Sequence, residues 1–222
     1  MIARRLPRLL ALLALMGMWR SPALSAQDPS AIVRRASGAY RGLASLQADF
    51  LQIIEDASLG DTLKSTGRLA QAGDNRFAMR FTDPAEDAIV IDGRHVWIYT
   101  PSTTPGQVIR MPVEADPVYG VNILAKVLDR PADRYQLSFV KSEQVGGRMQ
   151  DVVSTVPRSP TARFDRAVLW IDREDGLPRR IELDESPGVR RILVLSHLRP
   201  NAPLRTNTFV FEVPKGVRVV DQ

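Results

Sequence analysis

The sequence predicts a mainly β protein, built as a barrel or a strongly curved antiparallel sheet of about ten or eleven strands. Apolar and polar residues alternate with a period of two along most of the chain, as they do in half-buried strands. Glycine, proline and aspartate separate these runs at short, regular spacing, which favours hairpins over a parallel α/β fold. Helical spacing is found in two segments, residues 29–44 and 117–128.

The first predicted element is a helix over residues 29–44. Asp28-Pro29 is a typical helix start, because the carboxylate can cap free N–H groups and proline fits the first turn. Ile32, Ala36 and Tyr40 then recur at helical spacing, which predicts that one side of the helix is buried.

A second, strongly apolar helix is predicted over residues 117–128. Asp116-Pro117 opens it in the same way as the first helix, and the helix must end before Pro131. Ile123, Leu124 and Val127 are among its apolar residues.

The alternating runs predict strands over residues 46–50, 63–71, 76–81, 88–91, 94–99, 135–140, 149–156, 167–172, 178–183, 190–198 and 209–213. Asp92-Gly93 predicts a two-residue type I′ turn between two of them, because both turn positions need positive φ. That turn would place Ile89 opposite Val96, with Ile98 on the same face. The opposite face would carry Val90, Trp97 and Tyr99.

Residues 1–26 have the pattern of a secretory signal peptide, and residues 27–222 are expected to form a single domain. A basic start precedes a short apolar run over residues 9–19, and small residues follow it. The run is shorter than a membrane span requires. Cleavage fits after either Ser25 or Ala26.

Charge and composition exclude several function classes. The chain has 30 basic and 25 acidic residues, but residues 1–26 hold four arginines and no acid, so the remainder is nearly neutral. A protein that binds nucleic acid would need a concentrated basic face, so no nucleic-acid partner is expected. The absence of cysteine excludes disulfides, thiolate metal sites, a cysteine nucleophile and a lipid-anchored N-terminal cysteine.

No pattern in the sequence predicts a catalytic site, a metal site or a cofactor. The two histidines, His95 and His197, have no partner at metal-ligand spacing. Asp172, Glu174 and Asp175 lie beside a glycine and are typical of a turn. The chain contains no nucleophile elbow, phosphate-binding loop or dinucleotide motif.

The most informative feature is an apolar face shared by neighbouring predicted strands. Its members are Phe77, Met79, Phe81, Ile89, Val96 and Ile98. Such a face is most commonly the core of an antiparallel sheet. Alternation alone does not distinguish a filled core from a cavity.

Several segments resemble the outer-membrane lipoprotein carrier family (LolA). Residues 46–52 (LQADFLQ) are similar to its first-strand motif, in which a small residue, an aromatic residue and a glutamine follow the N-terminal helix. Residues 67–93 align with the family without a gap, and residues 96–101 (VWIYTP) resemble its aromatic strand. Residues 209–217 (FVFEVPKGV) resemble its closing motif, so the resemblance covers essentially the whole chain after residue 26.

The resemblance implies an incomplete, half-open antiparallel barrel whose open side is closed by helices that act as a lid. It implies a periplasmic, monomeric carrier without a cofactor. Such a carrier accepts lipoproteins from an inner-membrane ATP-driven transporter and delivers them to an outer-membrane receptor. The acyl chains would occupy a cavity lined by Leu46, Phe50, Phe77, Met79, Phe81, Ile89, Val96 and Ile98. The lid residues would be Tyr40, Leu43, Ile123, Leu124 and Val127.

One position departs from the family pattern. Gly73-Asp74 stands where the family commonly has Arg-Pro, and the resemblance implies that an arginine at this place holds the lid closed. The departure leaves open how the lid is held and which lipid is carried. Three alternatives therefore remain: a carrier of another lipid or glycolipid, a lipid-responsive envelope sensor, and a hydrolase. The sensor would need a further domain, and the hydrolase would need a triad or an acid pair.

Overall fold

The protein is described by a computed structural model over residues 27–113, 122–160, 162, 164–185 and 188–222. The predicted signal peptide and the predicted start of the second helix, residues 117–121, lie outside these residues. The helices are α1 (Pro29–Arg41), α2 (Ile123–Leu128) and α3 (Pro131–Arg134). The strands are β1 (Leu46–Asp56), β2 (Asp61–Ala72), β3 (Arg76–Asp83), β4 (Ala85–Asp92), β5 (His95–Tyr99), β6 (Gln107–Pro112), β7 (Tyr135–Val145), β8 (Arg148–Pro157), β9 (Arg166–Asp172), β10 (Pro178–Glu185), β11 (Val189–Pro200) and β12 (Arg218–Asp221).

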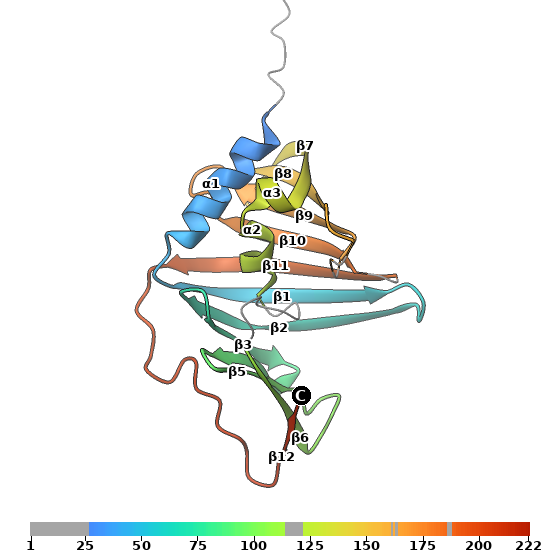
Figure 1. Cartoon of the computed structure of the whole chain (residues 1–222), viewed down its shortest axis with the longest axis vertical. Coiled ribbons are helices and arrows are strands. Elements are labelled where there is room, and N and C mark those ends of the chain that lie inside the picture. Colours follow the sequence, from blue (N-terminus) through green and yellow to red (C-terminus); the bar gives the residue numbers. More distant parts are fainter. Residues whose placement is uncertain (1–26, 114–121, 161, 163, 186–187) are drawn as a thin grey trace, which may run out of the picture.

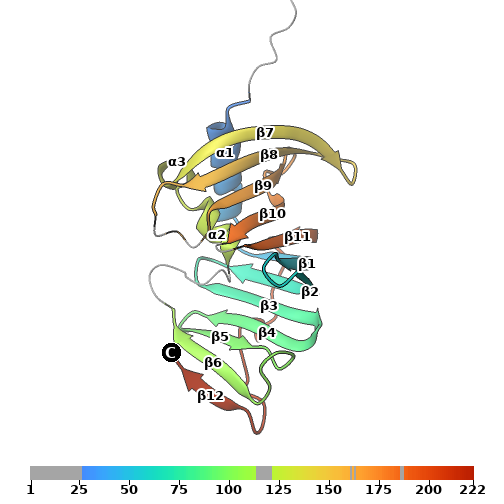
Figure 2. The same ribbon diagram turned by 90° about the vertical axis from the view of Figure 1, so that its right-hand side faces the viewer.

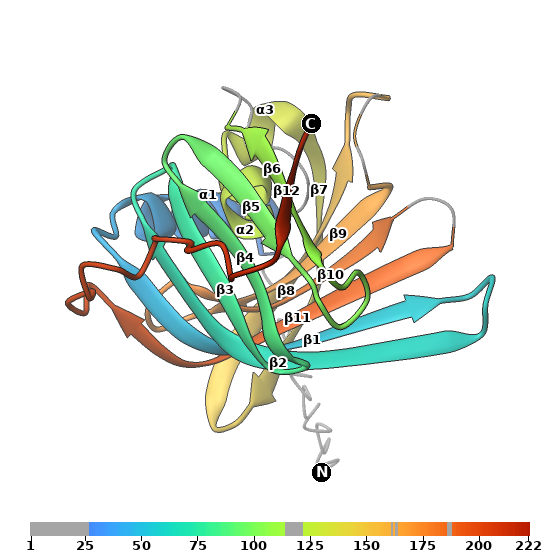
Figure 3. The same cartoon turned by 90° about the horizontal axis from the view of Figure 1, so that it is seen from below.

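Within the described residues, the twelve strands form one sheet that is not closed. Its order is β12-β6-β5-β4-β3-β2-β1-β11-β10-β9-β8-β7, and the two end strands do not pair with each other (Figures 1 and 2). Neighbouring strands are antiparallel apart from β12 and β6, which are parallel. The sheet curves around the helices, as the view from below shows (Figure 3). The prediction of a mainly β, half-open antiparallel architecture is therefore confirmed.

The first helix forms where the sequence predicts it but ends earlier. The Asp28 carboxylate accepts a hydrogen bond from the Ser30 backbone N–H at 2.9 Å, which caps the first turn. Val33 and Ala36 are fully buried on the inner side. The helix ends at Arg41 instead of near residue 44, because the next residue is Gly42, which has low helix propensity.

The β4–β5 hairpin has a different turn from the predicted one. Gly93, with φ at +98°, and Arg94 are the turn residues, and both Arg94 and the residue after it donate backbone hydrogen bonds to the Asp92 carboxylate at 2.8 Å. Ile89 therefore lies opposite Ile98, two residues beyond the predicted partner. Because a shift of two residues keeps every side chain on its face, the predicted grouping of faces is correct.

The predicted strand over residues 209–213 is wrong. This segment belongs to the long extended stretch between β11 and β12 (Figure 1). Phe211 stacks on Trp97 with ring centroids 5.5 Å apart, and the Arg80 guanidinium donates to the Val210 carbonyl at 2.8 Å. The alternation here reflects side-chain packing on the outer face of the sheet instead of a strand ladder. The strands β6 and β12, which pair with each other, were missed by the sequence pattern.

The turn between β9 and β10 contains the acids that the sequence assigns to a turn. Asp172 is buried, accepts a hydrogen bond from the Glu174 backbone N–H at 2.8 Å and forms an ion pair with Arg148. Burial raises the pKa of Asp172, but these hydrogen bonds and the charges of Arg148 and Arg179 outweigh burial and hold the pKa below its ordinary value. The role of Asp172 is therefore structural: it closes the turn.

The hydrophobic core lies between the inner face of the sheet and the helices. Inward-facing residues of neighbouring strands and the buried sides of α1 and α2 form one continuous apolar cluster. The other face of β3–β6 is also covered, and Val90 and Val108 on that side are fully buried. The C-terminal segment that carries Phe211 lies over this outer face. The inner cluster therefore includes the face on which the family resemblance places a cavity.

Candidate functional site

The structure brings the eight predicted cavity residues together on the inner face of β1, β3, β4 and β5. Five of them are buried members of the apolar cluster, and the other three are partly buried and pack against it. The buried ones are Leu46, Phe50, Phe77, Met79 and Val96, and the partly buried ones are Phe81, Ile89 and Ile98. Their role in lipid binding stays a prediction.

We call these eight inward-facing residues the inner wall. Local packing fixes their positions. Phe50 on β1 lies over Gly67 of β2, where the absence of a side chain leaves room for the aromatic ring. The same ring makes an edge-to-face contact with Phe81, with centroids 5.1 Å apart. The small residue on one strand thus allows two large ones to meet across the sheet.

The predicted lid residues are also part of this arrangement. Tyr40 on α1 and Leu124 and Val127 on α2 belong to the buried cluster, and Leu43, which follows α1, packs against it. Ile123 is the first residue of α2, but its side chain lies outside the described residues.

The helices α1 and α2, which carry the predicted lid residues, are joined to each other by a hydrogen bond. The Ser37 hydroxyl of α1 donates to the backbone carbonyl of Leu128 at the end of α2, at 2.6 Å. Ser37 is buried, so this bond is shielded from water and satisfies a carbonyl that the end of a short helix would leave unpaired. The helices therefore meet the sheet as a connected pair.

A buried polar cluster ties this pair to the sheet. The Tyr40 hydroxyl donates to Gln71 Oε1 and lies 3.1 Å from Asn122 Oδ1, and Asn122 Nδ2 donates to Gln71 Oε1 at 3.3 Å. Asn122 also caps α2, because its Oδ1 accepts from the Ala125 N–H at 3.2 Å. Burial raises the pKa of Tyr40 well above its ordinary value, so the hydroxyl stays protonated and can act as a donor.

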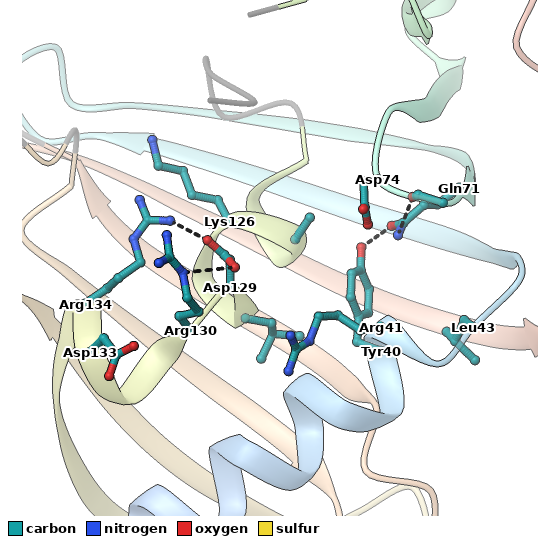
Figure 4. Close-up of a pocket in the computed structure, with 13 residues that line it drawn as sticks. Tyr40, Arg41, Leu43, Gln71, Asp74, Lys126, Asp129, Arg130, Asp133 and Arg134 are labelled. Atoms are coloured by element: carbon teal, nitrogen blue, oxygen red, sulfur yellow. Dashed lines mark hydrogen bonds and ion pairs between the residues drawn. The ribbon is translucent and has the colours of Figure 1, made fainter. Parts of the chain in front are cut away.

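A cavity of about 730 Å³ adjoins this polar cluster (Figure 4). It lies between the end of α1, the β2–β3 turn and the helices α2 and α3. The Asp129 carboxylate accepts a hydrogen bond from the Arg134 guanidinium at 2.9 Å and lies 3.8 Å from that of Arg130. The remaining lining side chains are Tyr40, Arg41, Leu43, Gln71, Asp74, Ala125, Lys126, Leu128 and Asp133.

The cavity lining is mostly polar and charged, and Leu43, Ala125 and Leu128 are its apolar members. Tyr40 and Gln71 line the cavity and are also buried in the contact between the helices and the sheet. Four cationic and three anionic side chains line the cavity, so its net charge is slightly positive.

Sequence reasoning missed Gln71 and Asn122. One signal was present for Gln71, because it shares strand parity with the inward-facing Leu69 and is therefore a polar residue at an inward position. No comparable signal was present for Asn122, since the predicted helix started further upstream.

The structure answers part of the question raised by Gly73-Asp74. Arg80, one of two nearby arginines, reaches the outer face and donates to the Val210 carbonyl, so it does not contact the lid. Arg76 is exposed on β3. Near Gly73-Asp74, a polar contact between the helices and the sheet is made instead by Tyr40, Gln71 and Asn122. Further towards the start of α1, Arg35 donates to the Arg173 carbonyl at 2.7 Å and lies 4.0 Å from the Asp151 carboxylate of β8.

Within the described ranges, no group of three or more potential ligand side chains is placed to hold a metal ion. His197 Nδ1 lies 2.9 Å from Asp49 Oδ2, and both side chains are exposed at the surface. No helix among the residues that the structure describes is long and apolar enough to cross a membrane.

The family model of the outer membrane lipoprotein carrier protein LolA matches residues 41–212 of this chain. The chain belongs to the LolA family. Proteins of this family are carriers and not enzymes. The chain is 23% identical to the outer-membrane lipoprotein carrier protein of Pseudomonas paraeruginosa over 215 residues, which cover 97% of this chain and 100% of that protein.

Two solved structures have a fold similar to that of this chain. An uncharacterized conserved protein from Thermus thermophilus has a TM-score of 0.57 and 16% identity, and the match covers 88% of this chain and 100% of that one. A chain of the Pseudomonas aeruginosa MucA/MucB complex has a TM-score of 0.51 and 23% identity. The match covers 87% of this chain and 64% of that one. The second protein is therefore substantially longer than the matched region.

Proposed function

We propose that this protein carries lipoproteins through the periplasm by enclosing their acyl chains between the inner face of the sheet and the lid helices. It would accept them from an inner-membrane ATP-driven transporter and deliver them to an outer-membrane receptor. Membership of the carrier family supports the general role. The signal peptide that the sequence predicts for residues 1–26 supports export.

The observation that carries the proposal is the apolar inner face of an open sheet, covered by short helices. The helix α1 has 13 residues and α2 has six, and neither takes part in the hydrogen-bond ladder of the sheet. Helices held in this way can be displaced at modest cost, whereas a strand in the middle of the sheet cannot, because its ladder would break. An acyl chain could therefore take the place of the lid side chains against the inner face.

The energetics of acyl transfer fit a carrier of this kind. Burying a methylene group away from water contributes about 0.8 kcal/mol, so an acyl chain needs cover throughout its passage. Moving the chain from a bilayer to a protein cavity contributes little, because the chain was already out of water. Loading therefore requires work from an ATP-driven partner, and unloading requires an acceptor that binds the chain better.

The proposal is tested by purifying the protein from periplasm after depletion of the outer-membrane receptor. Native mass spectrometry should then show a complex with a triacylated lipoprotein. Bound phospholipid or glycolipid without lipoprotein would indicate a carrier of another lipid. Failure to capture any lipoprotein under these conditions would contradict the proposal and favour an envelope sensor.

Two variants locate the site of binding. Ile89→Glu places a charge on the partly buried inner wall and should abolish lipoprotein capture while the protein remains folded. Val140→Glu introduces the same charge at an exposed position on β7 and serves as the matched control. Phe77→Glu should act like Ile89→Glu, although Phe77 is more deeply buried and circular dichroism must first show that the variant folds. Normal capture by Ile89→Glu would rule out the inner wall as the binding surface.

A further inference from the structure

Tyr40, Gln71 and Asn122 are polar side chains enclosed in a contact that is otherwise apolar. Their exposed fractions are 4%, 7% and 8%, respectively. Each comes from a different part of the structure: α1, β2 and the residue that caps α2. We call these three residues the polar triad. Buried polar groups are rarely retained in a core unless they are hydrogen-bonded, and here they satisfy one another.

The bonds within the polar triad depend on the lid being closed. Gln71 belongs to the sheet, whereas Tyr40 and Asn122 belong to the helices that cover it. When an acyl chain displaces the helices, the distances between these side chains must increase. The hydroxyl and the two carboxamide groups then lose their partners while apolar material still surrounds them, which is costly unless the entering molecule supplies new partners.

The position of the polar triad indicates which part of a ligand could supply new hydrogen-bond partners to these side chains. On one side lies the apolar cluster, and on the other lies the cavity of about 730 Å³ with the charged side chains Arg41 and Lys126 in its lining (Figure 4). A molecule with acyl chains and a polar end would place its chains in the first region and its polar end in the second. Its ester and amide linkages would lie at the boundary, next to the polar triad.

We propose that the polar triad is a binding subsite for the ester and amide carbonyl oxygens that join the acyl chains to the glyceryl-cysteine end of the cargo. In the empty carrier the three side chains bond to one another and hold the lid closed. In the loaded carrier the Tyr40 hydroxyl and the Gln71 and Asn122 amide groups donate to these carbonyl oxygens. The inference rests on the proposed function, because it assumes that acyl chains occupy the inner face.

The chemistry of the polar triad favours a neutral acceptor. Its members supply one hydroxyl and two carboxamide donors and carry no charge. An ester carbonyl accepts one or two such bonds, and an ether oxygen in the same place is a much poorer acceptor. The triad should therefore distinguish an acyl ester from an alkyl ether that has the same chain length.

A competition assay with two matched probes tests this discrimination. The mature protein is loaded with the apolar fluorophore N-phenyl-1-naphthylamine and titrated with 1-monopalmitoylglycerol or with 1-hexadecylglycerol, which has an ether in place of the ester. The wild-type protein should bind the ester up to about tenfold more tightly, a ratio that corresponds to about 1.4 kcal/mol. Equal binding of the two probes would overturn the inference and leave the proposed function standing. Displacement by neither probe would contradict both.

Tyr40→Phe and Gln71→Met assign the discrimination to the polar triad. Each variant keeps the size of the side chain and removes its polar group, so the ester-to-ether ratio should fall towards one. Tyr99→Phe removes a hydroxyl on the outer face and should leave the ratio unchanged. A triad that only holds the lid closed would give variants that bind both probes more tightly with the same ratio, and that result would overturn the inference. If Tyr40→Phe does not fold, Gln71→Met decides.

Two further ligands distinguish the source of the ester groups. A dipalmitoylglyceryl-cysteine peptide represents a lipoprotein, and dipalmitoyl phosphatidylglycerol represents a membrane phospholipid. Preferential binding of the peptide, reduced in Tyr40→Phe, supports both the inference and the proposed function. Preferential binding of the phospholipid, reduced in the same variant, would support a subsite for ester groups but contradict its assignment to lipoproteins.

Discussion

Gly67 in β2 allows the inner wall to form, and replacing it with alanine tests that account. A Cβ atom at this position would lie 2.3 Å from the Arg80 carbonyl oxygen and 2.8 Å from two ring carbons of Phe50. The carbonyl would have to move by about 0.7 Å to reach even the 3.0 Å below which real Cβ contacts are essentially absent. The neighbour is backbone in the β2–β3 ladder, so this shift cannot be made by rotating a side chain.

The expected cost follows from this geometry. Overpacking of a core typically costs 1–3 kcal/mol, and here the strain includes both main chain and a buried ring, so we expect Gly67→Ala to lower the free energy of unfolding by about 3 kcal/mol. Phe50 would also lose its edge-to-face contact with Phe81 if it moved away. For a domain of this size, the loss corresponds to a decrease in Tm of roughly 6–12 °C.

The assay is thermal and urea unfolding of the mature protein followed by circular dichroism. Gly38→Ala is the matched control, since Gly38 is exposed in α1 and a Cβ there would meet no atom within 4 Å. This control should gain about 0.5–1 kcal/mol, because alanine has higher helix propensity than glycine. A Gly67→Ala variant with the wild-type Tm would refute the packing described for the inner wall.

Three further predictions concern the turn, the outer face and the lid. The folded-state pKa of Asp172 is below its unfolded value, so the stability that Asp172 contributes is present above about pH 4 and is lost as the pH falls through the folded-state pKa. Asp172→Asn should lower the free energy of unfolding by ~2 kcal/mol at pH 7. Urea titrations of this variant should also show a weaker decrease in the free energy of unfolding as the pH is lowered. Phe211→Ala should cost ~2 kcal/mol and change Trp97 fluorescence, because their stacking is lost; an unchanged emission spectrum would contradict this contact. Ser37→Ala should increase hydrogen exchange in α1 and α2 several-fold, because it leaves the Leu128 carbonyl unpaired; exchange equal to wild type would show that this bond does not restrain the lid.

Much of the sheet could be predicted from the sequence, and the errors have identifiable causes. Alternation identified most strands and grouped their faces correctly, because side-chain period is a property of each strand alone. It failed at residues 209–213, where alternating side chains pack on a face without pairing to a strand. The sequence places the β4–β5 turn at Asp92-Gly93, whereas the structure has it one residue later, at Gly93-Arg94. Backbone hydrogen bonds to the Asp92 carboxylate accompany this turn, and the sequence pattern does not reveal them.

The sequence by itself determined the mainly β class, the two apolar segments that cover the sheet and the side on which the candidate lipid-binding residues lie. These follow from short-range periodicity, which a linear reading detects. Only the tertiary structure decided that the C-terminal segment covers the outer face and that Tyr40, Gln71 and Asn122 meet. Tyr40 is 31 positions from Gln71 and 82 from Asn122, so their contact depends on how the lid helices pack on the sheet. No local pattern encodes such a contact, because it arises when distant segments must satisfy each other's polar groups in a shared apolar interior.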